Sequence, residues 1–329
     1  MVHLSLPGIP MIIKKIIGNI ILFTLSAAMG LILTEGLLRI KNADQKNYNI
    51  EMWRYARLLK KKSPDAALGH EHIPGRSAKL QGVMIRINGL GMRGPDVDFN
   101  DHSRKRILFL GSSNTLGWGV PEEKTLPAII QRELQDKAFV FNAGIGNYNA
   151  ARYVTLFEKR FLGLKPDTVV INCFVRDAEL LEPGGGNFFL RHSELAVLLF
   201  HLYYLRMNSS AGGIGNLVEH YRKIYRHDSP GFQEMLKAFD RLQELSKQQG
   251  FRIILTMIPD VHQMSPYPFT FAHEEMRKIA SEHGWTFLDF TPALSRVPAS
   301  DLWAMPGDPH LNSKGHEIMA KDLLPYLNA

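Results

Sequence analysis

Beyond Arg106 the sequence alternates between short apolar runs and stretches with helical periodicity, a pattern that few folds accommodate. The runs contain no regular alternation of apolar and polar residues, as expected of strands that are buried on both faces. We predict strands at 107–110, 139–142, 168–174, 251–258 and 286–290. A predicted helix follows each strand, and five such units in a row indicate an α/β domain with a parallel, doubly wound sheet.

Three of these helices have apolar residues at three- and four-residue spacing. Their apolar faces carry Leu126, Ile129, Ile130 and Leu134; Tyr153, Leu156, Phe157 and Phe161; and Phe232, Met235, Leu236, Phe239 and Leu242. The third helix has the plainest ends, because Ser229 and Pro230 favour a helix start and Gly250 favours a stop.

Residues 16–34 form an uncharged, largely apolar stretch that is long enough to cross a hydrocarbon core as a helix. We predict a short tail at 1–15 and a transmembrane anchor at 16–38. A cleaved signal peptide is an alternative, since residues 26–28 resemble a small-residue cleavage site, but the apolarity continues through Leu33 and favours an uncleaved anchor. A buried core helix is the second alternative.

The net charge of +7 would suit a nucleic-acid-binding protein, but much of the excess falls between Arg39 and Lys62, directly after the apolar stretch. This position favours lipid headgroups, and we predict no nucleic-acid partner. Lys14 and Lys15 precede the stretch, while Arg39 and Lys46 follow it, so the positive-inside rule alone does not set its orientation.

The rest of the chain divides into a connector and a main domain. We predict residues 39–104 as a basic juxtamembrane connector that ends in a glycine-rich stretch of loops and turns, and residues 105–329 as the α/β domain. The alternation breaks down at about 178–230, which contains an apolar segment at 195–205. We predict an insertion there, because long irregular excursions are often lids or binding loops, and an apolar helix in it could also touch the membrane.

A serine follows the first predicted strand of the domain. Because Ser113 lies in the turn after Gly111, its hydroxyl is expected at the carboxyl edge of the sheet, where ligands bind in open α/β folds. It is a candidate nucleophile, and the nearby glycines permit turns that leave N–H groups free for an oxyanion. A helix cap or a phosphate contact is the alternative, but no Lys-Ser or Lys-Thr pair follows at the spacing of a phosphate loop.

A histidine and a carboxylate lie together near the other end of the chain. His310 follows Asp308 by two residues and precedes the final predicted helix. An imidazole can accept the serine proton, while a carboxylate holds the ring and stabilises its charged form. An ordinary surface histidine is the alternative. We predict Ser113 as nucleophile, His310 as its base and Asp308 as the residue that orients the base.

Together these motifs resemble the SGNH or GDSL-type hydrolase superfamily over about residues 88–326. The matching stretches are Gly111-Ser112-Ser113 with residues 117–120, residues 141–146, and Asp308-x-His310-x-Asn312 followed by Gly315-His316. The resemblance implies a flavodoxin-like, five-stranded sheet, called the SGNH hydrolase fold, and serine esterase or acyl-transfer activity. It also implies that the backbone N–H groups of Ser113 and Gly144 bind the oxyanion.

The sequence departs from the family pattern in two places. Ser112 stands where the family has Asp, which changes the local hydrogen bonding. The third block ends in Arg176-Asp177 where the family has Asn-Asp, and the missing Asn would donate to the oxyanion. Losing one such donor costs about 3 to 4 kcal/mol of transition-state stabilisation, and the Arg176 guanidinium could replace it. An ion pair of Arg176 with Asp177 or a neighbouring acid is the alternative.

Other polar and aromatic residues near the matched blocks are candidates for substrate binding. They are Asn114, Trp118, Asn142 and Asp177. No cofactor and no metal is predicted, because the stretches at His273 and His316 lack the second histidine of a zinc-binding helix. His70 and His72 have no evident partner, and we predict solvated loop positions for them. The single cysteine, Cys173, lies in an apolar run and is predicted to be a buried thiol.

The resemblance, with an anchor in front, implies an enzyme that acts on ester-linked acyl groups, above all O-acetyl groups, of a cell-surface polysaccharide or lipid. It also implies a single-pass protein of the cell membrane with an extracytoplasmic, periplasmic catalytic domain. The altered first and third blocks leave a second hypothesis, a catalytically silent domain that binds glycan or scaffolds a membrane-bound polysaccharide assembly. A lipid esterase facing the cytoplasm is a third. The sequence predicts no oligomeric state.

Overall fold

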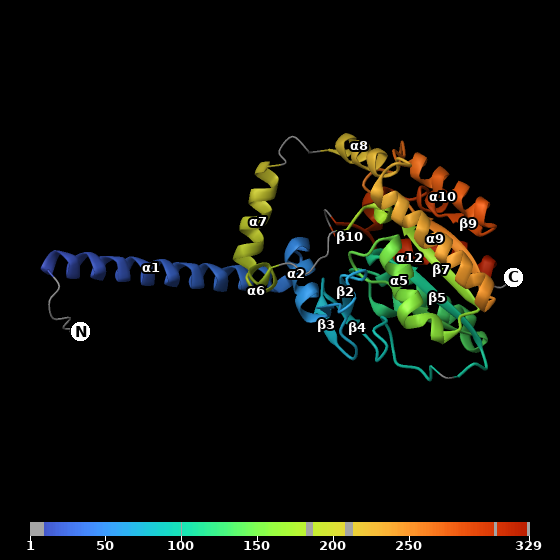
Figure 1. Cartoon of the computed structure of the whole chain (residues 1–329), viewed down its shortest axis with the longest axis horizontal. Helices are drawn as coiled ribbons and strands as arrows, with labels where there is room; N and C mark the ends of the chain where they lie inside the picture. The colour runs from blue at the N-terminus through green and yellow to red at the C-terminus, as the bar shows by residue number, and fades with distance from the viewer. Residues whose placement is uncertain (1–9, 100, 182–186, 208–212, 306–307, 328–329) are drawn as a thin grey trace.

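The computed structural model describes residues 10–99, 101–181, 187–207, 213–305 and 308–327, and its centre is a parallel five-stranded sheet in the order β6-β5-β7-β8-β9 (Figure 1). The strands are β5 (Lys105–Gly111), β6 (Ala138–Asn142), β7 (Thr168–Phe174), β8 (Arg252–Ile258) and β9 (Thr286–Asp289). The predicted fold class and all five predicted strands are confirmed. In this order the chain reverses direction across the sheet at the pair β5 and β7, where doubly wound folds bind their ligands.

Helices cover both faces of the sheet. One face carries α4 (Leu126–Leu134), the short α11 (Thr291–Leu294) and α12 (Ser313–Leu327), and the other carries α5 (Ala150–Leu156), α9 (Pro230–Gln249) and α10 (Thr270–His283). A π-helical segment, Phe157–Phe161, continues α5. The predicted apolar faces of α4, α5 and α9 all point into the two cores, and α9 starts and ends where predicted.

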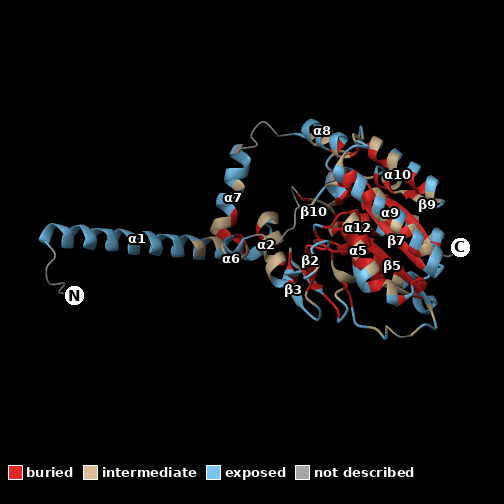
Figure 2. Cartoon of the chain, in the orientation of Figure 1, coloured by how far each residue is buried: buried red, intermediate tan, exposed pale blue. Residues whose placement is uncertain are grey.

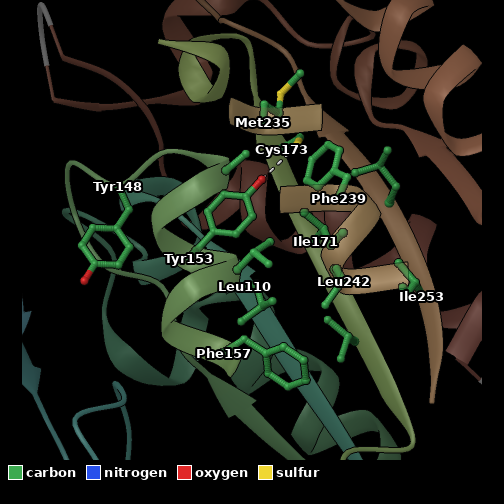
Figure 3. Close-up of a cluster of buried hydrophobic side chains, with 14 of the residues drawn as sticks. Leu110, Tyr148, Tyr153, Phe157, Ile171, Cys173, Met235, Phe239, Leu242 and Ile253 are labelled. Atoms are coloured by element: carbon green, nitrogen blue, oxygen red, sulfur yellow. Dashed lines mark hydrogen bonds between the residues drawn. The ribbon is translucent and has the colours of Figure 1, made fainter. Parts of the chain in front are cut away.

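The central strand shows why the strand sequences lack alternation. Val169, Ile171 and Cys173 of β7 pack into the core under α5 and α9, while Val170 packs into the core on the opposite face. Figure 3 shows the first of these cores, where the Tyr153 hydroxyl lies 3.2 Å from the sulfur of Cys173. The cysteine is fully buried, as predicted.

The segment before the sheet is more ordered than a connector. After α1 (Met11–Lys41) it contains α2 (Tyr48–Leu58) and two antiparallel pairs, β1 (Lys60–Lys62) with β2 (His70–His72) and β3 (Ser77–Leu80) with β4 (Val83–Arg86). These elements were not predicted. Tyr55, Ile85 and Trp118 share a buried cluster that fastens the segment to the sheet domain.

The prediction that His70 and His72 lie in solvated loops is wrong. Both are buried in β2, where one nitrogen of His72 lies 2.6 Å from the Tyr55 hydroxyl and a nitrogen of His70 lies 3.1 Å from the carbonyl of Gly146. Burial lowers the pKa of His72 to about 4, so the ring is neutral at pH 7. The two histidines therefore help to fix β2 against the loop after β6.

Most of α1 lies apart from the rest of the chain, and only its C-terminal end contacts α7. It projects from the domain as a single long helix with no buried residue (Figures 1 and 2). By length and composition it could cross a membrane, although a signal sequence passes the same test.

In its described residues the expected insertion contains three helices, α6 (Phe188–His192), α7 (Glu194–Met207) and α8 (Ile214–Ile224). The apolar segment predicted at 195–205 forms most of α7, which contacts the end of α1. Residues 182–186 and 208–212 of the insertion lie outside the described part of the chain, as do residues 1–9 of the predicted tail.

Candidate active site

The turn after β5 is built around a glycine. Gly111 has φ +155°, and a Cβ there would lie 2.1 Å from the Thr115 side-chain oxygen, so only glycine fits. The chain then turns directly into the single-turn helix α3 (Ser113–Leu116). Ser113 is its first residue, and a backbone N–H in the first turn has no acceptor within its own helix. The nucleophile candidate and a free N–H therefore lie at the same point of the sheet edge.

Ser113 meets His310 across 197 positions of sequence. The Ser113 Oγ lies 2.7 Å from His310 Nε2, and His310 Nδ1 lies 2.6 Å from Asp308 Oδ1. The same carboxylate oxygen accepts the backbone N–H of His310 at 3.1 Å. Because Nδ1 donates to the carboxylate, Nε2 is left to accept the serine proton. Asp308 and His310 belong to β11 (Asp308–Leu311), which pairs with β10 (Trp303–Met305).

The far side of Asp308 is held by the N-terminal segment. The side-chain amide of Gln81 donates to Asp308 Oδ2 at 2.8 Å, and the carboxylate is 1% exposed. Burial opposes ionisation of Asp308, but the hydrogen bonds from His310 and Gln81 outweigh it and hold the pKa of Asp308 below its ordinary value. Asp308 is thus a fixed anion behind the imidazole.

Tyr48 of α2 covers the imidazole from the same side. Its ring lies 5.9 Å from that of His310, centroid to centroid, and burial together with the charge of Asp308 raises the pKa of Tyr48 to about 12. Both rings line a cavity of about 120 Å³. It is lined by Tyr48, Met52, Ser112, Ser113, Asn114, Asn147, Tyr148, Phe174, Arg176, Asp177, Tyr221, Asp260, His262 and His310.

Gly144 does not face this cavity, which corrects the expected oxyanion donor. Its N–H already donates to Asn142 Oδ1 at 3.0 Å, and a Cβ at Gly144 would lie 2.2 Å from the backbone nitrogen of Leu116. Only glycine fits at this position, because α3 packs too closely to leave room for a side chain. The Asn142 side chain is buried and occupied by this contact, so it is not available to a substrate either.

Asn147, three residues after Gly144, lies at the cavity. From 143 to 146 each backbone N–H has an acceptor, respectively the carbonyl of Phe109, the side chain of Asn142, the carbonyl of Gly111 and the hydroxyl of Tyr55. Asn147 is the first residue whose N–H no described residue accepts. It lines the cavity with φ +64°, a left-handed conformation that asparagine tolerates.

The third block places Arg176 and Asp177 at the cavity in different roles. The Arg176 Nε donates to Glu179 Oε2 at 2.5 Å, so the ion pair with a neighbouring acid is present, although Asp177 is not the partner. Asp177 is fully buried and accepts the backbone N–H of Phe174 at 3.1 Å. Burial raises the pKa of Asp177 to about 8 against these contacts, so this carboxyl is largely neutral at pH 7.

Of two more predicted binding residues, only one lines the cavity. Asn114 lines the cavity, and its Oδ1 accepts the backbone N–H of Leu311 at 3.5 Å, which links α3 to the strand that carries His310. Trp118 is 1% exposed and packs on Tyr55 with ring centroids 5.4 Å apart. Its role is to seat the N-terminal segment, and the expectation that it binds substrate is wrong.

A second Asp-His pair lines the same cavity and was not predicted. Asp260 and His262 follow β8, with His262 Nδ1 2.5 Å from Asp260 Oδ1. The hydrogen bond to Asp260 raises the pKa of His262. Its signal was present in the sequence, because Asp260-x-His262 repeats the spacing of Asp308-x-His310 after another strand. No sequence signal marks Tyr48 or Gln81.

Among the described residues no group of three or more His, Cys, Asp or Glu side chains is arranged to hold a metal ion. His316, which ends the last matched block, is buried and neutral: its Nδ1 accepts the backbone N–H of Leu126 at 2.9 Å, and burial lowers its pKa to about 3. It ties α12 to α4.

Comparisons with known proteins matched one family model and several solved structures. The model of the GDSL-like Lipase/Acylhydrolase family matches residues 109–318, and the comparison with curated proteins gave no match. Among solved structures, an alpha/beta hydrolase from the metagenome of Lake Arreo, Spain, is 16% identical with a TM-score of 0.46, covering 68% of this chain and 95% of that one. A catalytic mutant of an acetylxylan esterase from Geobacillus stearothermophilus is 17% identical with a TM-score of 0.45, covering 68% and 94%.

Proposed function

Because the chain belongs to the GDSL-like lipase/acylhydrolase family, we propose that it is a serine esterase or acyl-transfer enzyme with Ser113 as nucleophile, His310 as base and Asp308 as the anion behind the base. The observation that carries the proposal is the continuous hydrogen-bonded line from Ser113 Oγ through the imidazole to Asp308, with contacts of 2.7 and 2.6 Å. Side chains in this order and at these distances activate a serine hydroxyl.

The first half of the reaction transfers the acyl group to the enzyme. His310 Nε2 takes the Ser113 proton as Oγ attacks the ester carbonyl carbon, and the carbonyl oxygen becomes an oxyanion. The backbone N–H groups of Ser113 and Asn147 are the proposed donors to that oxyanion, since each is free and at the cavity. The carbon–oxygen bond to the alcohol then breaks, and His310 protonates the departing alkoxide.

The second half releases the acyl group. Water, or a hydroxyl of an acceptor, gives its proton to His310 and attacks the acyl carbon, and the bond to Ser113 Oγ breaks as that oxygen regains a proton. Water as acceptor makes the enzyme an esterase, and a second alcohol makes it an acyltransferase. His262, held by Asp260 in the same cavity, is the proposed contact for the incoming or departing hydroxyl.

The size and lining of the cavity favour a small acyl group on a polar alcohol. A cavity of about 120 Å³ suits a small acyl group such as acetyl better than a long acyl chain. Arg176, Asp260 and His262 give the wall charged and polar groups that can bind hydroxyls. We therefore propose O-acetyl groups on a sugar of a cell-surface polysaccharide as the substrate.

We propose α1 as a single-pass membrane anchor, with the domain on the extracytoplasmic side. Its length and apolar composition support the anchor. The side is tested by fusing alkaline phosphatase or a fluorescent protein after Ala329, since the first is active only outside the cytoplasm. Activity of a cytoplasmic fusion alone would place the domain on the other side and overturn this part of the proposal.

The proposed nucleophile is tested with an aryl acetate ester and a fluorophosphonate probe. We expect wild-type protein to release the aryl alcohol and to carry the probe on Ser113, as located by peptide mass spectrometry. Ser113→Ala removes the attacking oxygen and should abolish both signals. Ser295→Ala, at an exposed serine, is the matched control and should keep both.

Two results would overturn the assignment. Probe labelling that persists in Ser113→Ala places the nucleophile elsewhere. Glycan binding by wild-type protein that neither hydrolyses nor transfers acyl groups, and takes up no probe, favours the catalytically silent alternative.

A further inference from the structure

α7 exposes apolar side chains all the way around. Seven of the eight residues from Leu198 to Leu205 are exposed Leu, Phe or Tyr, and Leu199 and Tyr203 are 56% and 62% exposed. Eight consecutive residues make more than two helical turns, so no face of this helix is polar. A helix that is apolar on every side is normally buried in protein or in lipid. The neighbouring α6 adds Phe188 and Phe189, each 69% exposed.

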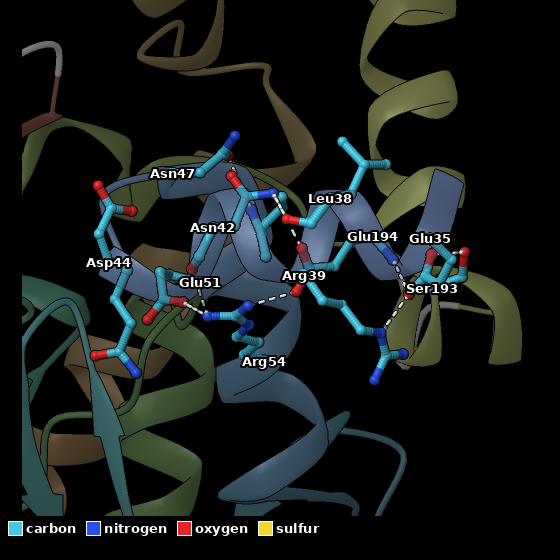
Figure 4. A network of polar contacts seen from close by, with 12 residues as sticks. Glu35, Leu38, Arg39, Asn42, Asp44, Asn47, Glu51, Arg54, Ser193 and Glu194 are labelled. Atoms are coloured by element: carbon cyan, nitrogen blue, oxygen red, sulfur yellow. Dashed lines mark hydrogen bonds and ion pairs between the residues drawn. The ribbon is translucent and has the colours of Figure 1, made fainter. Parts of the chain in front are cut away.

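Polar contacts lock the start of α7 to the end of α1 (Figure 4). The Glu35 carboxylate of α1 accepts the Ser193 hydroxyl at 2.9 Å and the backbone N–H groups of Glu194 and Leu195 at 3.1 and 3.0 Å. Arg39 donates to the carbonyl of His192 at 2.7 Å. The position of α7 along α1 is therefore fixed at Glu35, one residue beyond the uncharged stretch 16–34.

This position places α7 at the surface of the bilayer that α1 would cross. The stretch 16–34 is about 28 Å long as a helix, close to the hydrocarbon thickness of about 30 Å. Glu35 then marks the level where hydrocarbon gives way to headgroups. α7 runs across the direction of α1, on the side of the domain from which α1 leaves (Figure 1). Tyr203 and Tyr204 are of the type that is enriched at this level of a membrane.

A basic cavity opens beside the same junction. It measures about 360 Å³, and its wall includes Arg39, Arg54, Arg57, Lys79 and Arg191 against the single carboxylate of Glu194. The Glu194 carboxylate accepts hydrogen bonds from Arg54 and Asn42. In the described part of the chain no ion pair neutralises Arg57, Lys79 or Arg191, and the buried Nε of Arg191 has no hydrogen-bond acceptor. The cavity therefore has an excess of positive charge at headgroup level.

We propose that α6 and α7 are seated in the membrane surface around the exit of α1, and that the basic cavity binds the phosphate of an anionic phospholipid. Three observations favour lipid. α7 is joined to α1, its apolar side chains are exposed, and the cavity beside it is positively charged. Arginine and lysine bind phosphate strongly, and unpaired basic groups near a membrane favour anionic lipids. The proposal rests on α1 as the anchor but not on the chemistry of Ser113.

The seating of α7 is tested by depth-dependent quenching on the full-length protein in nanodiscs. Single cysteines at Ile21→Cys in α1, Leu199→Cys in α7 and Lys278→Cys in α10 carry a fluorophore, and the buried Cys173 of unmodified protein gives the background. We expect lipids with a quencher near the headgroup to quench position 199 at least about threefold more than position 278. Position 21 should respond to quenchers deep in the acyl chains.

The outcomes separate the two proposals. Quenching at 21 with position 199 no more quenched than 278 would keep the anchor and overturn the seating of α7. A label at 21 that no lipid quenches would remove the anchor, and the seating with it, while leaving the esterase assignment to its own test.

The headgroup site is tested by the thermal unfolding midpoint of full-length protein in detergent, titrated with short-chain phosphatidylglycerol, short-chain phosphatidylcholine or inorganic phosphate. We expect phosphatidylglycerol alone to raise the midpoint, with an apparent Kd at least about tenfold higher in Arg57→Glu/Lys79→Glu. The control Lys247→Glu/Lys278→Glu, with the same charge change on α9 and α10, should behave as wild type. If the lipid-free midpoint of the first variant falls, Arg57→Gln/Lys79→Gln replaces it.

Equal responses to both lipids, or a phosphatidylglycerol response that the Arg57 and Lys79 changes leave intact, would overturn the headgroup site. An equal response to inorganic phosphate would reassign the cavity to a soluble anion and overturn its role in lipid binding.

Discussion

The sheet domain and the helices α1 and α7 differ in where their apolar side chains lie. In the sheet domain, residues such as Phe239 and Val170 are fully covered by other parts of the same chain, whereas Phe200 of α7 is 48% exposed (Figure 2). Apolar surface is stable only away from water. The exposed apolar side chains of α1 and α7 therefore need a cover that the described chain does not supply, and we propose that this cover is the membrane.

Residues 42–99 lie between these two regions and contact both α7 and the candidate active site. Glu51 of α2 accepts from Arg54 on the side of α7 and from the backbone N–H of Gln81 on the other, and Gln81 in turn holds Asp308. The Ser-His-Asp line belongs to the sheet domain, but the hydrogen bond behind Asp308 comes from Gln81 in residues 42–99. The following predictions test whether the sheet domain and the helices α1 and α7 have these separate roles.

The largest expected effect concerns chemistry that belongs to the sheet domain alone. Asp308→Asn keeps the shape of the side chain but removes the anion behind His310, and kcat for an aryl acetate should fall by about 10⁴-fold. Membrane association, measured by flotation with liposomes, should not change. Wild-type turnover in this variant would contradict the role of Asp308.

The next effect tests the two kinds of apolar surface directly. Phe239→Ala opens a cavity in the core and should lower the free energy of unfolding by about 3 to 5 kcal/mol. Phe200→Ala, the matched change on α7, should cost less than about 0.5 kcal/mol for protein in detergent, as is usual for exposed positions. Thermal or urea unfolding of both full-length variants measures the difference. Equal costs would mean that α7 is covered by protein.

A smaller effect is expected where the two regions meet. Gln81→Ala removes a hydrogen bond to a charged group worth about 1.5 to 3 kcal/mol, so kcat/KM should fall by about 10- to 100-fold. Because Gln81 helps to hold the pKa of Asp308 down, its loss should raise that pKa, so the carboxyl should take up its proton at a higher pH, as measured by NMR titration of the Asp308 carboxyl carbon. Gln248→Ala on the surface of α9 is the control. An unshifted pKa of Asp308 would remove Gln81 from the site.

The smallest effect concerns the contact between α1 and α7. Glu35→Ala removes the acceptor for two N–H groups at the start of α7, a loss typical of a helix cap at about 1 to 2 kcal/mol. Amide hydrogen exchange at Glu194 and Leu195 should quicken by about tenfold, measured by mass spectrometry in nanodiscs, with esterase activity unchanged. Unchanged exchange would show that α7 is held by other contacts.

Much of the sheet domain could be predicted because its signals are local. Strands buried on both faces leave uninterrupted apolar runs, and Ser113, Asp308 and His310 lie in short motifs after predicted strands. The hydrogen bond that occupies the Gly144 N–H could not be predicted, for a different reason. Whether Gly144 or Asn147 offers its N–H depends on backbone direction and on the acceptors nearby, which residue type does not reveal. Tyr48 and Gln81 lie in the stretch 39–104, which the sequence predicts only as a connector, so no motif marks either residue.

The α/β class, the nucleophile and base candidates, and a helix fit to cross a membrane could all be read from the sequence, because periodicity and composition follow from which residues avoid water. The contact between Ser113 and His310, the hydrogen bond from Gln81 to Asp308 and the start of α7 beside Glu35 became visible only in the folded chain. Contacts between distant segments depend on how elements pack in three dimensions, and that information is spread over the whole chain.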